Sequence, residues 1–278
     1  MNNKKIAVCI SGHPRTIGKT ARGFFDLFGE DIDFFFSTWD SCKGEQAENK
    51  LKEEGINLKA FEYVSEPDYS YHELNILESY PGGFPDFFIL SQWYGFKRSL
   101  RLMLDYEEVH NITYDYIFRA RFDLAFDTSL EELFKLSSDD AINYIAAITK
   151  GSDQFFYGLR KNMIKFIDFE KWLISFPEKF GTQYGYFASP LVKAFVLDNN
   201  IKLNNVLQPI KVIRATSGSA RELREARTRQ YIINNFPDLS NDVWVGDRSK
   251  MKVSKPAPWD KNYTDKFKSM FMTNGVES

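Results

Sequence analysis

Three short apolar runs, separated by stretches of helical character, fill the first 65 residues of the chain. Each run has the length and the branched or aromatic content of a strand buried on both faces. Strands joined through a helix lie parallel in one sheet. We therefore predict an α/β fold with a Rossmann-type, mostly parallel sheet flanked by helices. The predicted strands are 6–10, 32–38 and 58–64, and the predicted helices are 19–28 and 45–54.

The rest of the chain continues this alternation with two irregular segments. Residues 65–86 are rich in Pro, Gly and Tyr, and a loop of this length in a compact domain is usually functional. Residues 237–278 carry prolines and many lysines, which favours an irregular arm. We therefore predict a catalytic domain over 1–236 and a C-terminal arm over 237–278. Further strands are expected at 114–126, 141–148 and 206–213, and further helices at 86–106, 161–176 and 221–235.

The strand predicted at 114–126 carries three charges. Side chains alternate between the two faces of a strand, so Arg119, Arg121 and Asp123 are expected on one face. Charges on an otherwise apolar strand persist when they are paired, hydrated or turned toward a ligand. Two cations and a carboxylate suit a phosphorylated ligand, with a divalent metal on Asp123. An internal Arg–Asp salt bridge is the alternative.

The segment Gly12–Thr20 follows a predicted strand and opens a predicted helix, as a phosphate-binding P-loop does. A P-loop has four residues between its first Gly and the Gly-Lys-Thr, whereas five separate Gly12 from Gly18. Pro14 also lacks a backbone N–H for phosphate. Two other interpretations stay open: a plain turn, or a nucleotide or diphosphate site at the strand end. The residues that would line such a site are Gly12, Arg15 and Thr16.

Four other polar residues are candidates for the same site. Asp40 follows a predicted strand and is expected either to contact a nucleotide or to cap a helix. Gln92 and Lys97 lie early in a predicted helix and are candidate donor contacts, whereas the adjacent Trp93 suits the core. Asp153, in a loop after the strand at 141–148, is a candidate general base or metal ligand. An Asx turn is the structural alternative for Asp153.

Composition excludes several functional classes. The formal net charge is −2, so no global field favours nucleic acid or an anionic membrane. There are two cysteines and three histidines without metal-ligand spacing, and no hydrolase triad motif or zinc motif is present. No signal peptide pattern and no run of about 20 apolar residues is found. We expect a cytoplasmic protein, with peripheral membrane contact as an option.

Several short motifs together resemble GT-A type glycosyltransferases of bacterial and viral polysaccharide or lipopolysaccharide biosynthesis. The order of the motifs and their spacing, over residues 5–200, carry this resemblance. The motifs are Ser11-Gly-x-x-Arg15, Thr38-Trp-Asp40, a Gln-bearing helix, Arg119-x-Arg-x-Asp123 and Asp153-Gln-Phe155.

The resemblance implies transfer of a sugar from a nucleotide-diphosphate donor to a hydroxyl of a glycan or glycolipid. It implies donor contacts from the residues named above, Asp123 as metal or donor ligand and Asp153 as base. GT-A enzymes commonly carry Asp-x-Asp for a divalent metal, manganese or magnesium, but this chain has Arg121-Phe122-Asp123. Metal dependence is therefore open. The alternatives are a P-loop-like phosphoryl-transfer enzyme and a non-catalytic glycan-binding protein.

Overall fold

The computed structural model describes residues 4–67, 86–145, 153–180, 188–206 and 210–212. The chain divides into two compact units, Met1–Arg214 and Ala215–Ser278, and every described residue belongs to the first. The predicted helix at 221–235 and the predicted boundary at 236 lie outside the described residues. So does most of the predicted loop at 65–86, from residue 68 to residue 85.

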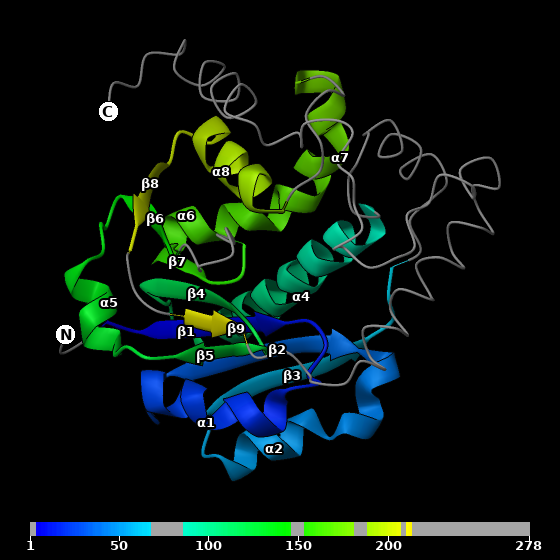
Figure 1. Cartoon of the computed structure of the whole chain (residues 1–278), viewed down its shortest axis with the longest axis vertical. Coiled ribbons are helices and arrows are strands. Elements are labelled where there is room, and N and C mark those ends of the chain that lie inside the picture. Colours follow the sequence, from blue (N-terminus) through cyan, green and yellow to red (C-terminus); the bar gives the residue numbers. More distant parts are fainter. Residues whose placement is uncertain (1–3, 68–85, 146–152, 181–187, 207–209, 213–278) are drawn as a thin grey trace, which may run out of the picture. The chain divides into compact units, whose positions relative to one another are not determined.

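Seven strands of the described part form one sheet, in the order β3-β2-β1-β4-β7-β6-β8 (Figure 1). All of them run in the same direction except β7, which is antiparallel to both of its neighbours. The predicted α/β fold with a mostly parallel sheet is thus confirmed. The strands are β1 (Ile6–Ser11), β2 (Asp33–Trp39), β3 (Leu58–Val64), β4 (Tyr116–Arg121), β6 (Ala141–Tyr144), β7 (Phe156–Leu159) and β8 (Lys202–Asn205).

Helices cover both faces of this sheet: α1 and α2 on one, and α4, α7 and α8 on the other (Figure 1). The α-helices are α1 (Ile17–Phe28), α2 (Ala47–Glu53), α4 (Asp86–His110), α5 (Leu130–Lys135), α6 (Arg160–Met163), α7 (Phe169–Phe180) and α8 (Ala188–Asp198). Two 3-10 helices are η1 (Asp40–Glu45) and η2 (Ile164–Asp168). No described helix combines the length and the apolar character needed to cross a bilayer.

The three consecutive phenylalanines of β2 show why the sheet is covered on both faces. Phe34 and Phe36 pack with the residues of α1, whereas Phe35 contacts Tyr106 and Tyr114 on the opposite face. All three phenylalanines are at most 1% exposed. Alternation along a strand therefore supplies apolar surface to two separate helical layers.

A second aromatic core lies between the sheet and helices α4 and α7. Trp93 of α4 is 1% exposed and contacts Phe156, Phe166 and Phe169. The expectation that Trp93 suits the core is borne out. This core also surrounds Arg119, a charged side chain of β4.

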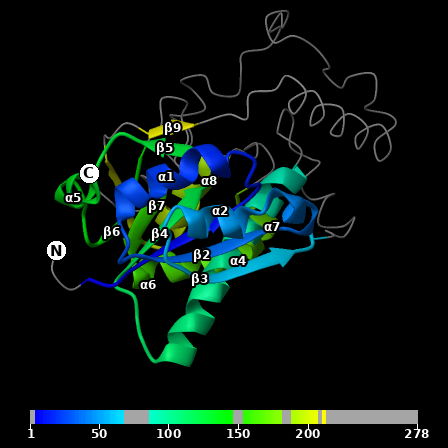
Figure 2. The same ribbon diagram turned by 90° about the horizontal axis from the view of Figure 1, so that it is seen from below.

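The predicted strand at 114–126 is in fact two strands. β4 ends at Arg121, residues 122–123 form a turn, and β5 (Leu124–Phe126) pairs with β9 (Ile210–Val212) in a second sheet. Figure 2 shows β5 and β9 side by side next to α1. Asp123 therefore lies in a turn and does not share a strand face with Arg119 and Arg121, so that prediction was wrong. The turn consists of Phe122 and Asp123, and Asp123 is its one residue of a type that turns favour, so the alternating sequence pattern continues through it.

Smaller elements differ in the same way. Of the strand predicted over 206–213, the structure describes residues 206 and 210–212, and Ile210–Val212 form β9. The sequence did not indicate β8, because Lys202–Asn205 is polar. By contrast, the capping box at Ser129 is present: Glu132 N–H donates to Ser129 Oγ at 3.2 Å, and Ser129 N–H donates to Glu132 Oε2 at 3.1 Å. Helix α5 begins directly after it.

Candidate functional site

The carboxyl ends of β1, β2 and β4 meet at one edge of the sheet. Ser11 lies opposite Ser37 on one side and opposite Arg121 on the other, so the segments after these strands are neighbours. The chain crosses from one side of β1 to the other between β3 and β4. Ligands of open α/β sheets bind at such a switch point, outside the carboxyl ends of the strands.

Asp153 reaches the same edge by a different route. Because β7 is antiparallel to β4, with Phe156 opposite Arg119, the residues just before β7 lie beside the carboxyl end of β4. The structure thus places Asp153 at the same sheet edge as Asp123.

Gly12 forms the turn that follows β1. Its φ of +115° is in a region that L side chains rarely adopt, although an added Cβ would meet no atom within 4 Å. Its N–H donates to Ser37 O at 3.3 Å, and its carbonyl accepts a hydrogen bond from Thr38 Oγ1 at 2.9 Å. The turn is thus tied to β2, and its backbone conformation requires glycine.

Replacement of Gly12 by alanine should therefore lower the free energy of unfolding by about 1–3 kcal/mol, the usual range for a side chain held in such a backbone conformation. Urea unfolding at equilibrium measures the change. Gly18→Ala is the matched control, because Gly18 has helical backbone in α1 and equal room for a Cβ. It should be neutral or slightly stabilising. Equal losses in both variants would contradict the conformational explanation.

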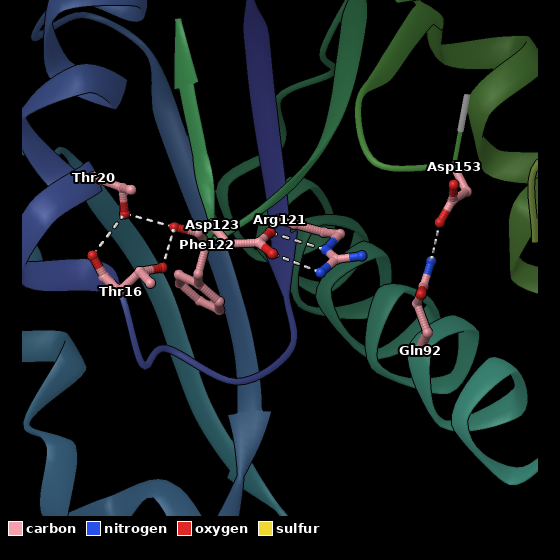
Figure 3. A network of polar contacts seen from close by, with 7 residues as sticks. All are labelled: Thr16, Thr20, Gln92, Arg121, Phe122, Asp123 and Asp153. Atoms are coloured by element: carbon pink, nitrogen blue, oxygen red, sulfur yellow. Dashed lines mark hydrogen bonds and ion pairs between the residues drawn. The ribbon is translucent and has the colours of Figure 1, made fainter. Parts of the chain in front are cut away.

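Thr16, which immediately precedes α1, and Thr20 of α1 hold the turn between β4 and β5. The hydroxyls of Thr16 and Thr20 donate to the carbonyl oxygen of Phe122, at 3.1 and 2.5 Å (Figure 3). Both side chains are buried. The hydroxyl of Thr16, predicted to line a ligand site, thus makes a structural hydrogen bond, and sequence reasoning did not foresee this pairing.

The turn presents a bidentate ion pair. Arg121 Nε and Nη2 donate to the two carboxylate oxygens of Asp123 at 3.0 and 2.7 Å, as Figure 3 shows. The Arg121 side chain is 25% exposed and that of Asp123 16%. The salt-bridge alternative is therefore present in the structure, at the edge where a ligand would bind.

Asp153 is held by Gln92, the seventh residue of α4. Gln92 Nε2 donates to Asp153 Oδ2 at 3.0 Å, and Figure 3 shows the two side chains pointing at each other. The carboxylate is largely buried, since Asp153 is 7% exposed. Both residues were candidates from the sequence, but the sequence did not predict that they contact each other.

Arg119 lies beneath this edge and has no exposed surface. Its guanidinium carbon is 4.8 Å from the ring centre of Trp93, 5.4 Å from that of Phe96 and 5.6 Å from that of Phe156. Burial lowers the pKa of Arg119 to about 9, and the nearby Asp153 carboxylate opposes this shift. The side chain is therefore a cation at neutral pH, stabilised by aromatic faces.

The remaining predicted residues are dispersed around the edge. Asp40 begins η1, forms a salt bridge with Lys43 at 2.8 Å and accepts a hydrogen bond from Ser65 at 2.8 Å. These two hydrogen bonds, that of Lys43 first, lower the pKa of Asp40. Arg15 is exposed on the turn after β1. Lys97 forms a salt bridge with Glu170 of α7 at 3.0 Å, a partner that the sequence gave no means of finding.

No protein-family model and no curated protein sequence matches this chain. Solved structures do show a likeness of fold. A nucleoside-diphosphate-sugar pyrophosphorylase from Vibrio cholerae RC9 is 10% identical with a TM-score of 0.43, over 79% of this chain and 99% of the other. A glycosyltransferase involved in glycosylation of the major capsid of PBCV-1 is 10% identical with a TM-score of 0.39, over 79% and 98%.

A third likeness is to glucosyl-3-phosphoglycerate synthase from Mycobacterium tuberculosis, whose structure contains Mg²⁺ and uridine diphosphate. It is 11% identical with a TM-score of 0.39, over 83% of this chain and 77% of that one. A glycosyltransferase and a nucleoside-diphosphate-sugar pyrophosphorylase are thus among the structures that this chain is distantly similar to. At such identities and TM-scores these structures assign no role to any residue of this chain.

Proposed function

We propose that this chain is a glycosyltransferase that moves a sugar from a nucleotide-diphosphate donor to a hydroxyl of a glycan or glycolipid acceptor. The supporting observation is that two carboxylates lie at one edge of the sheet, beside its switch point. Asp123 is paired with Arg121, and Asp153 is held by Gln92. The motifs at Ser11–Arg15, Thr38–Asp40, Arg119–Asp123 and Asp153–Phe155 lie at or next to this edge, and Gln92 of the Gln-bearing helix contacts Asp153.

Each residue has a role in this proposal. Gly12, Arg15 and Asp40 line the nucleotide, and Arg121 neutralises the diphosphate as it leaves, which is the main electrostatic task in the reaction. Asp153 accepts the proton of the acceptor hydroxyl. Asp123 orients Arg121 or binds a metal.

A divalent metal fits this edge only together with the donor. In the described ranges no group of three or more His, Cys, Asp or Glu side chains is arranged to hold a metal ion, and both Asp123 oxygens bond to Arg121. Magnesium sites often combine one or two carboxylates with substrate phosphates. Asp123 would then hold Mg²⁺ or Mn²⁺ with the diphosphate oxygens, and the ion would supply charge neutralisation.

The phosphoryl-transfer alternative is less well supported. In a P-loop, the Ser or Thr hydroxyl after the lysine binds Mg²⁺. Here Thr20 is 1% exposed and donates its hydroxyl proton to Phe122 O. Thr20 is therefore engaged in holding the β4–β5 turn.

Thermal unfolding with nucleotides tests the proposal. We expect UDP, GDP, CDP or ADP, with MnCl₂, to raise the melting temperature more than ATP does. At a hundredfold excess over Kd the shift should be about 5–10 °C, from the binding free energy and the size of the unit. ATP hydrolysis that is lost in Lys19→Ala would instead favour phosphoryl transfer. A glycan-binding protein would respond to glycans and to none of these nucleotides.

A further inference from the structure

A buried arginine, Arg119, lies opposite Phe156 of β7, three residues after the candidate base Asp153. None of the three side-chain nitrogens of Arg119 has a partner among the described residues. Burying a cation is expensive unless it is compensated. An apolar side chain of similar volume would fill this space at a lower energetic cost than a buried cation. The positive charge therefore needs an explanation of its own.

The surroundings of Arg119 connect it to Asp153. Its guanidinium lies over Trp93, whose neighbour in α4 is Gln92, and Gln92 donates to the Asp153 carboxylate. It also lies over Phe156, which follows Asp153 by three residues and pairs with Arg119 across β4 and β7. The same two elements, α4 and β7, thus enclose the cation and position the carboxylate.

We propose that Arg119 is a positioning residue that acts through Asp153. The aromatic rings hold the Arg119 guanidinium in place. Its positive charge stabilises the Asp153 carboxylate in the orientation that the hydrogen bond from Gln92 fixes. Arg119 makes no contact with the donor. This assigns different tasks to the two arginines of β4. Arg121, which is partly exposed, faces the diphosphate, whereas Arg119 supports the base from below. The catalytic part of this inference rests on the proposed function.

A double-mutant cycle on stability tests the coupling without any ligand. The variants are Arg119→Met, Asp153→Asn and the combination, and the measurement is the midpoint of urea unfolding. In the native background Arg119→Met should lower the midpoint, because it removes a positive charge that attracts the Asp153 carboxylate. In the Asp153→Asn background the same change should raise the midpoint, because the buried cation has then lost the carboxylate that most favours its charge. Equal changes in both backgrounds would overturn the proposal.

The cycle needs one control variant and one substitute variant. Arg98→Met is the matched control, since Arg98 also lies on one of the elements involved but pairs with Glu62. Its effect should be the same in both backgrounds. If Arg119→Met does not fold, Arg119→Gln, which also removes the charge, replaces it in the cycle and should show the same opposite effects in the two backgrounds. Equal effects of Arg119→Gln in both backgrounds would overturn the proposal.

Donor affinity and turnover of the Arg119 variants then distinguish two roles for Arg119: positioning of the base Asp153, and direct contact with the donor. In Arg119→Met the dissociation constant for UDP, measured by calorimetry, should stay within about twofold, since the guanidinium has no exposed atom. Release of UDP from UDP-glucose should fall about tenfold, part of the 10²–10⁴ that acid–base catalysis contributes. Arg119→Lys should restore most of this loss, and Arg119→Met should cause no further loss in Asp153→Asn.

The outcomes of these measurements are distinct. A UDP dissociation constant that rises tenfold or more in Arg119→Met would show donor contact and overturn the proposal. Failure of the native chain to bind UDP would count against the proposed function with this donor. In that case the stability cycle still decides whether Arg119 and Asp153 are coupled.

Discussion

Asp123→Asn should abolish sugar transfer, with turnover falling by about 10²–10³-fold, as expected when a preorganised charged group at the reacting centre is lost. Asparagine has nearly the same shape but no charge, so Arg121 loses its bidentate partner and any metal loses its carboxylate. The Arg121 and Asp123 side chains are partly exposed, so the loss of stability should be only about 1–2 kcal/mol, below that of a fully buried pair. Donor turnover and the melting temperature are measured on the same variant.

Asp26→Asn is the matched control for this prediction. Asp26 also accepts a hydrogen bond from an arginine, Arg22, at 2.9 Å, but on the exposed surface of α1. It should change neither turnover nor the melting temperature appreciably. A large fall in melting temperature in Asp123→Asn, with nucleotide affinity retained by the folded fraction, would make the Arg121–Asp123 pair purely structural.

Asp153→Asn should lower turnover by about 10²-fold or more while the KM for the donor changes little, since a general base acts on the acceptor proton. The amide keeps the volume and one acceptor for Gln92 but cannot take a proton. Steady-state kinetics with varied donor and acceptor give the two constants separately. Asp198→Asn is the control, because Asp198 also accepts a side-chain hydrogen bond, from Trp172 Nε1 at 2.8 Å on the other side of α7.

Other results for Asp153→Asn would reassign the residue. A rise in donor KM that matches the fall in turnover would make Asp153 a donor or metal ligand. Unchanged turnover would leave it with the structural role of a turn residue.

The parallel half of the fold could be predicted from sequence because its strands are continuous apolar runs. β1 and β2 carry apolar side chains on both faces, a pattern that helices on two sides require. The direction of β7 could not be predicted in this way. Its apolar residues fit a parallel or an antiparallel neighbour equally well, and only long-range pairing with β4 decides between them.

The sequence indicated candidate residues for the site but not the contacts between them. The alternation along β4 makes Arg119 and Arg121 look equivalent. Their environments differ because Trp93 and Phe156, from distant parts of the chain, enclose only the first. The aromatic surroundings of Arg119 depend on tertiary packing, which cannot be predicted from a local sequence pattern.

The bonds from Thr16 and Thr20 to Phe122 O have a consequence for how such a chain can change during evolution. They join Thr16, just before α1, and Thr20, in the second turn of α1, to the turn after β4, although 102 residues or more separate the partners. An insertion in the turn after β4, or between Thr16 and Thr20, would move one partner away from the other. Changes of length at either place should therefore be tolerated poorly.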